Sequence, residues 1–315
     1  MLGFLVRRLI MLIGTLLVSS FVIYSALYLA PGNPIATLTG GRTPSPDAVR
    51  TLEERYHLND PFLVRYWDWL VGVVHGDFGV SIPLHQDVST LIAERIGITL
   101  GLVAYAAVII LVLGIGAGIL AALRPGLIDT SVIVGSTISA ALPSFVAAIV
   151  LLLVFSVQLG WFPAFGPGGT GVDRLYHLTL PAIALALASL AIVSRVTRAC
   201  VRDELRREHV QTAVSRGIPR HLVIRRHVLR NASIPITTVA GLTIASLIAL
   251  SAVVERAFAL NGLGAYLIQA ALSKDFAVVQ GISLVLVIAF VITNTVIDIL
   301  YALLDPRVKL GERAS

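Results

Sequence analysis

Six long stretches without a charged residue constrain this chain more than any other feature of its sequence. They span residues 9–29, 96–123, 131–159, 175–194, 231–254 and 276–297. Each reaches the roughly 20 apolar residues that a helix needs to cross a bilayer, and in lipid such a backbone satisfies its own hydrogen bonds only as a helix. Because 57% of the residues are hydrophobic and only 13% are charged, the composition excludes a disordered chain and argues against a soluble globular one. The sequence predicts an all-α polytopic membrane protein with six transmembrane helices.

The distribution of charge predicts which side of the membrane each loop occupies. Six spans place both termini on one side, where the segments hold 16 basic and 7 acidic residues. The segments on the opposite side hold 8 basic and 11 acidic residues. Since Lys and Arg accumulate in cytoplasmic loops, we expect both termini in the cytoplasm. The positive net charge then records orientation and does not indicate a nucleic acid partner. The first span is long and lacks a cleavage site, which favours an uncleaved anchor over a signal peptide.

The loops divide the chain into four predicted parts. Residues 1–30 form the N-terminal end and first span, and residues 31–95 form an external segment that is partly helical. Residues 96–304 form a five-helix core with a basic cytoplasmic loop at 195–230, and residues 305–315 form a cytoplasmic tail. Within the external segment, helical patterns are expected at residues 47–56 and 62–74. The second is amphipathic and carries Trp67 and Trp69, so we expect it near the outer interface.

The sequence lacks the motifs of several kinds of catalytic, nucleotide-binding and metal-binding site. Neither lysine closes a phosphate-binding loop, and no serine hydrolase or zinc protease motif is present. The single cysteine, Cys200, excludes an internal disulfide and a cysteine zinc cluster. The seven histidines are scattered at spacings that do not match a metal site. We therefore predict a chain with no catalytic residue, no metal site and no ATP site of its own.

The spans carry residues that could bend them or line a pathway. Prolines loosen the helical hydrogen-bond ladder, and small residues allow helices to approach closely; Gly114, Gly116 and Gly118 are expected to pack the second span in this way. A bundle of bending helices fits a gated pathway, although glycine and proline are also frequent in ordinary membrane helices. Asp298 is the one acid embedded in an apolar run, either as a functional group or as a packing acid paired with a basic residue. The candidate pathway residues are Pro143, Ser144, Pro181, Pro235 and Asp298.

The cytoplasmic loop contains a short helix with a sharp stop. Val210, Ala213 and Val214 share one face of a helical wheel. Gly217 followed by Pro219 is a C-terminal stop signal. We expect an exposed cytoplasmic helix ending in a tight turn, after which a run of arginines leads back to the membrane.

This loop resembles the EAA loop of ABC-importer permeases, in the version typical of peptide-type permeases. The matching residues are Gln211-Thr212-Ala213-x-x-x-Gly217, followed by Arg226-His227-x-Leu229-Arg230-Asn231-x-x-x-Pro235. Other segments resemble the same family in the same order along almost the whole chain, among them Pro31-Gly32-Asn33-Pro34, Gly76-Asp77-Phe78-Gly79, Leu159-Gly160-Trp161-Phe162-Pro163, Gly262-Leu263-Gly264 and Asp305-Pro306-Arg307. Gln211 and Thr212 depart from the Glu-Ala of the general motif, and His209 stands where tyrosine is common.

The resemblance implies a type I ABC-importer permease architecture and a mechanism. A second, related permease subunit would complete the pathway, and two ATPase subunits would bind ATP and Mg²⁺, so that this chain needs no cofactor. A substrate-binding protein would deliver dipeptides or oligopeptides on the outer face. The loop helix would dock into an ATPase subunit and act as a lever through Val210, Gln211, Thr212, Ala213, Val214, Ser215, Arg216 and Gly217.

Other functions are kept as alternatives. The same family also carries nickel or metal chelates and glutathione, which the sequence does not separate from peptides. A stand-alone secondary transporter or channel would need coupling charges in the spans, which Asp298 alone does not supply. An intramembrane enzyme would need a catalytic pair that the spans do not offer.

Overall fold

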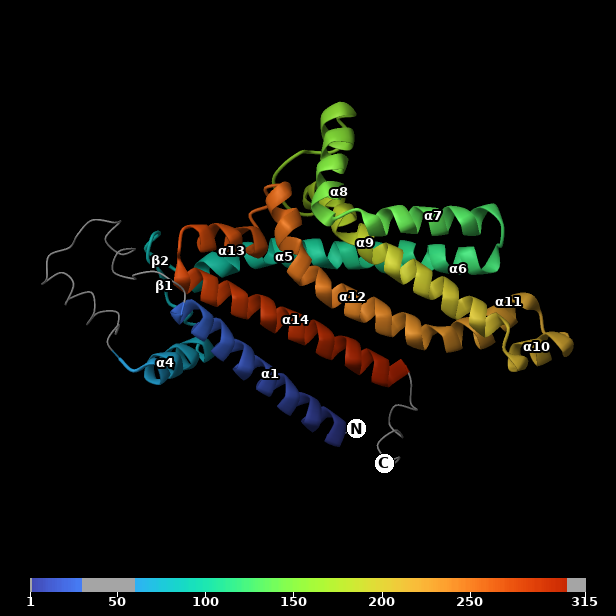
Figure 1. The fold of residues 1–315 in the computed structure, drawn as a ribbon, viewed down its shortest axis with the longest axis horizontal. Coiled ribbons are helices and arrows are strands. Elements are labelled where there is room, and N and C mark those ends of the chain that lie inside the picture. The colour runs from blue at the N-terminus through green and yellow to red at the C-terminus, as the bar shows by residue number, and fades with distance from the viewer. Residues whose placement is uncertain (1, 30–59, 305–315) are drawn as a thin grey trace, which may run out of the picture. The chain divides into compact units, whose positions relative to one another are not determined.

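The computed structural model describes residues 2–29 and 60–304, and most of these residues are helical (Figure 1). The helix predicted at residues 47–56 lies outside the described residues. The described chain falls into two compact units: residues 98–261 with 292–304, and residues 2–29 and 60–97 with 262–291. Helices α5 (Val88–Ile109) and α14 (Phe276–Leu304) each run from one unit into the other.

Helix α9 is the centre of the first unit. It packs against α6, α7, α8 and α12, and its buried residues include many alanines and serines, which let neighbouring helices approach closely. The elements after α5 are η1 (Ile110–Gly114), α6 (Ile115–Leu123), α7 (Leu127–Ala141), α8 (Ser144–Leu151), η2 (Leu152–Gln158), α9 (Val172–Leu205), α10 (Glu208–Ser215), α11 (Arg220–Val223), η3 (Ile224–Leu229) and α12 (Arg230–Ala257), where η marks π-helical segments.

The second unit contains the amphipathic helix that the sequence predicts at residues 62–74. Its elements are α1 (Leu2–Tyr28), α4 (Phe62–Val74), β1 (Val80–Ser81), β2 (Gln86–Asp87), the start of α5, α13 (Leu263–Leu272) and the first half of α14. The two strands pair antiparallel, with Val80 opposite Asp87. Helix α4 packs its aromatic side chains against α1, where Tyr66 lies edge-on to Phe21 at 5.3 Å between ring centroids. The opposite side of α4 exposes Trp67.

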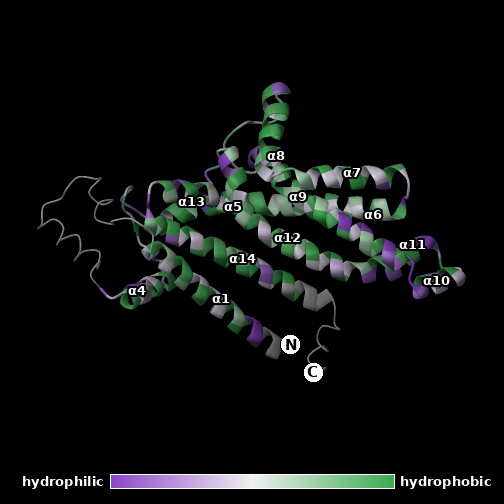
Figure 2. Cartoon of the chain, viewed as in Figure 1, coloured by the Kyte–Doolittle hydropathy of each residue, from purple (hydrophilic) through white to green (hydrophobic). Residues whose placement is uncertain are grey.

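Five of the six predicted spans are helices long and apolar enough to cross a membrane. The third is different: α7 and α8 meet at a bend of 105°, so the continuous helix predicted at residues 131–159 is wrong. Pro143 causes the break, because proline excludes the preceding residue from the helical region; Leu142 accordingly has an extended ψ of 116°. The bent pair counts as a sixth span only if its two halves are taken together. Figure 2 shows hydrophobic residues along the long helices and hydrophilic residues gathered around α10 and α11.

Glycines bring η1 and α6 into close contact with α9, as the sequence predicts for two of three positions. A Cβ on Gly118 would lie 2.6 Å from both the Ser194 carbonyl oxygen and the Thr197 Cβ, and one on Gly114 would meet Val193 at 3.4 Å. The prediction for Gly116 is wrong, since a Cβ there meets nothing within 4 Å. Positions four residues apart share a helix face, whereas the residue between them points elsewhere.

Candidate functional site

Helix α10 ends in a Schellman motif centred on Gly217. The Ile218 N–H donates to the Ala213 carbonyl at 3.2 Å, and the Gly217 N–H donates to the Val214 carbonyl at 2.9 Å. Gly217 has φ of +73°, the left-handed conformation that this cap requires. Pro219 then begins a new turn as the N-cap of α11. The structure thus confirms the predicted stop, and its cause is local backbone chemistry.

The buried face of α10 joins an apolar cluster shared with α6, α9, α11, η3 and α12. Val210 is 3% exposed and Ala213 is 5% exposed. They pack with Ala122, Val201, Val223, Val228, Ala232 and Ile236. Val214, which the sequence places on the same side of the helical wheel, is not covered by this cluster: its side chain is 59% exposed. The cluster packs against the side of α10 that carries Val210 and Ala213 and leaves Val214, the next position along the helical wheel, uncovered.

The remaining residues of the predicted lever form an exposed surface, which we call the α10 face. It consists of Gln211, Thr212, Val214, Ser215 and Arg216. The Thr212 hydroxyl donates to the carbonyl of Glu208 at 2.9 Å within the helix, and the Gln211 side-chain amide donates to the Arg206 carbonyl at 3.3 Å. The α10 face therefore presents one apolar side chain among polar ones, an arrangement suited to docking against another protein.

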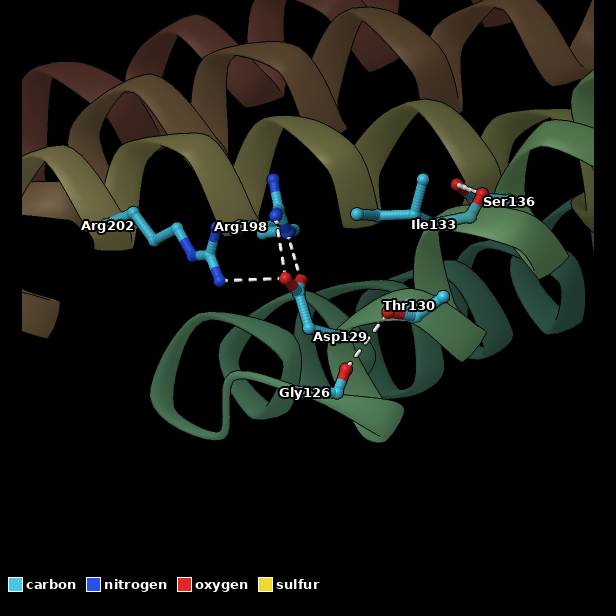
Figure 3. Close-up of polar contacts among 7 residues, drawn as sticks. All are labelled: Gly126, Asp129, Thr130, Ile133, Ser136, Arg198 and Arg202. Carbon is cyan, nitrogen blue, oxygen red and sulfur yellow. Dashed lines mark hydrogen bonds and ion pairs between the residues drawn. The ribbon is translucent and has the colours of Figure 1, made fainter.

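An ion cluster joins the start of α7 to α9, and sequence reasoning missed it. The Asp129 carboxylate accepts two hydrogen bonds from the Arg198 guanidinium, one of them from Nη2 at 2.9 Å. Arg202 Nη2 donates to the same carboxylate at 2.8 Å (Figure 3). The paired geometry is the strong, directional form of this interaction. Arg198 and Arg202 lie one turn apart on α9, so the sequence could have predicted that they share one face of the helix. The spacing does not identify Asp129 as the acid that they contact.

A second missed contact involves a buried acid in α12. Sequence reasoning placed Glu255 outside the fifth span, but α12 continues to Ala257 and buries Glu255 completely. Its carboxylate accepts a hydrogen bond from the Thr99 hydroxyl at 2.7 Å. A buried carboxylate is tolerated only with such partners, so this pair ties α5 to α12.

The candidate pathway residues lie on separate elements. Pro143 and Ser144 occupy the break between α7 and α8. Pro181 is buried inside α9, and Pro235 lies inside α12 with an exposed ring. Asp298 is on α14, and its side chain is outside the described part of the structure. The prolines of α9 and α12 do not end their helices, in contrast to Pro143.

Known proteins resemble the chain along its whole length. It is 37% identical to the oligopeptide transport system permease protein AppB of Bacillus subtilis, covering 98% of this chain and 100% of that protein. It is 32% identical, at the same coverage, to the dipeptide permease DppB of Alkalihalophilus pseudofirmus and to the oligopeptide permease OppB of Escherichia coli K12.

A solved structure shares the fold. A chain of the MetNI methionine ABC transporter in an inward-facing conformation matches with a TM-score of 0.54 and 18% identity, covering 68% of this chain and 96% of that one. Residues 1–103 match the N-terminal part of the membrane component of binding-protein-dependent transport systems. Residues 114–310 match the description "binding-protein-dependent transport system inner membrane component". The chain therefore belongs to this family of ABC-importer permeases and is a multi-pass membrane protein of that kind.

Proposed function

We propose that this chain is the permease subunit of an ATP-driven importer whose substrates are dipeptides or oligopeptides. The proposal is supported by similarity over 98% of the chain to relatives named as oligopeptide and dipeptide permeases. Neither nickel or metal chelates nor glutathione is favoured by any of the relatives named above. Membership of a permease family also argues against a stand-alone transporter or an intramembrane enzyme.

Helix α10 is the element that receives the movement of an ATPase subunit. The observation that carries this proposal is the combination of an exposed α10 face with a buried attachment. Gln211, Thr212, Val214, Ser215 and Arg216 are free to contact a partner, whereas Val210 and Ala213 fasten the helix to the permease. Gly217 fixes the angle at which the chain leaves the helix. A helix held on one face and exposed on the other can transmit a push to the helices below it.

The proposed assembly contains partners for each step. A second related permease completes the pathway, two ATPase subunits hold ATP and Mg²⁺, and an extracytoplasmic binding protein delivers the peptide. Both termini and α10 lie on the cytoplasmic side, in line with the excess of basic residues in those segments. The bend at Pro143 and Ser144, and the prolines at 181 and 235, provide positions at which the spans could change shape. Asp298 remains a candidate pathway residue.

Purification of the tagged chain from its native membrane tests this assembly. We expect a second permease and two ATPase subunits to co-elute with the tagged chain. In liposomes, the complex should transport radiolabelled trialanine only when ATP is supplied on the side of the membrane that carries α10. Import of nickel or glutathione with no import of trialanine would overturn the peptide assignment alone. Transport by the purified chain without an ATPase would overturn the whole proposal.

A further inference from the structure

Three helices of the first unit meet around one carboxylate. Glu204 lies in the last turn of α9, which ends at Leu205. Helix α10 begins at Glu208 and α12 begins at Arg230. The Glu204 side chain is only 15% exposed, although its neighbour Asp203 is exposed. The carboxylate is thus directed into the junction between the helices.

The contacts of Glu204 reach both of the other helices. Asn231 Nδ2, in the first turn of α12, donates to Glu204 Oε1 at 2.9 Å. His209 Nε2, in the first turn of α10, lies 3.1 Å from the same oxygen. The two nitrogens are 3.3 Å apart, within hydrogen-bond distance of each other, so the Asn231 amide contacts both Glu204 and His209. Arg207 Nε lies 3.9 Å from the other carboxylate oxygen.

The apolar cluster beneath this junction contains residues of the same three helices: Val201 of α9, Val210 of α10 and Ala232 of α12. Apolar packing holds helices together but is not directional. Hydrogen bonds to a carboxylate are directional and about twice as strong as neutral ones. The cluster therefore supplies adhesion, and the carboxylate fixes the rotation of α10 relative to α9 and α12.

We infer that Glu204 is the positioning residue through which α10 moves α9 and α12 together. The inference rests on the proposed coupling role of α10 and goes beyond it by naming the residue that transmits the movement of α10 to both α9 and α12. Without the carboxylate, α10 stays attached through Val210 and Ala213 but can rotate on its apolar face. Movement of the docked helix is then lost before it reaches the spans.

The first test compares Glu204→Ala with Asp203→Ala in the complete purified complex, reconstituted in liposomes. ATP hydrolysis and trialanine import are both measured, and assembly is followed by co-elution of the subunits. We expect Glu204→Ala to hydrolyse ATP while importing about tenfold less peptide per ATP, a typical coupling loss. Asp203→Ala removes the same charge from an exposed neighbour and should couple like the wild type. Equal coupling in both variants would overturn the inference.

A donor–acceptor exchange keeps the test decisive if Glu204→Ala fails to assemble. Asn231→Asp places a second carboxylate against Glu204 and should uncouple the complex by repulsion. Adding Glu204→Gln to this variant lets the glutamine amide donate a hydrogen bond to the new aspartate, which reverses the direction of the original bond. The double variant should recover peptide import per ATP. A double variant no better than Asn231→Asp would refute the positioning role. If the wild-type complex itself shows no ATP-driven import, the proposed function fails instead, which separates the two results.

Discussion

Replacing Gly217 with valine isolates the backbone requirement of the turn that ends α10. A Cβ at this position meets nothing within 4 Å, so the substitution creates no clash with neighbouring atoms. Its cost comes from φ of +73°, where an L-residue loses roughly 1–2 kcal/mol and a β-branched residue is a genuine outlier. Asparagine is the matched control, because its side chain tolerates the left-handed region.

The expected size of the effect follows from that cost. A penalty of about 1–2 kcal/mol changes the ratio of closed to open turn by about 5- to 30-fold. The two capping hydrogen bonds, from Gly217 and Ile218, are the ones that should open. Opening frees the last turn of α10 and, in the proposed assembly, changes the angle at which the α10 face meets an ATPase subunit. Gly217→Val should therefore reduce peptide import per ATP, and Gly217→Asn should remain close to the wild type.

Two measurements check this prediction. Hydrogen exchange of peptides that cover residues 213–218 should be faster in Gly217→Val by a factor in the range given above, with little change in Gly217→Asn. Import of trialanine per ATP should decrease in the same order. Valine and asparagine variants with the same exchange rate and the same import would refute the backbone argument.

Three further predictions concern packing, charge and pH. Gly118→Ala should destabilise the complex by about 1–3 kcal/mol through overpacking, and Gly116→Ala should not; thermal unfolding distinguishes them, and equal midpoints would contradict the contact. Asp129→Ala should lower the unfolding midpoint more than Asp129→Asn, because asparagine keeps one acceptor for the two arginines; an identical decrease would argue against the ion cluster. Burial raises the pKa of Asp275 above its usual value of 3.8, partly offset by the hydrogen bond from the Ser81 hydroxyl. The unfolded chain then releases this proton first, so the free energy of unfolding should fall as pH rises from 3.8 through the raised pKa. Asp275→Asn should lose this part of the pH dependence, and an unchanged pH profile would contradict it.

Several features of the fold could be predicted because their causes are local in sequence. The apolar windows fix where most spans lie, since a backbone in lipid has no alternative to a helix. The 3.6-residue period of α4 predicted its bounds, Phe62–Val74. Gly217 and Pro219 predicted the end of α10, because the cap depends on backbone conformations that only a few residues adopt. Pro143 predicted a bend, although not that α7 and α8 would turn by 105°.

The candidate site depended on contacts between residues far apart in the chain. Asp129 and Arg198 are 69 residues apart, and Glu204 and Asn231 are 27 apart. Which acid meets which base depends on how α7, α9 and α12 pack, and a list of charges does not contain that information.

What the sequence by itself determined was the class of protein, the positions of most of its long helices and the existence of a sharply ended helix in the basic loop. Only the tertiary structure decided which side of that helix is buried. Val210, Ala213 and Val214 all fit one apolar stripe on a helical wheel, but the cluster contributed by α6, α9, α11, η3 and α12 covers only the first two. The physical reason is that periodicity is a property of one helix, whereas burial is set by the helices that surround it.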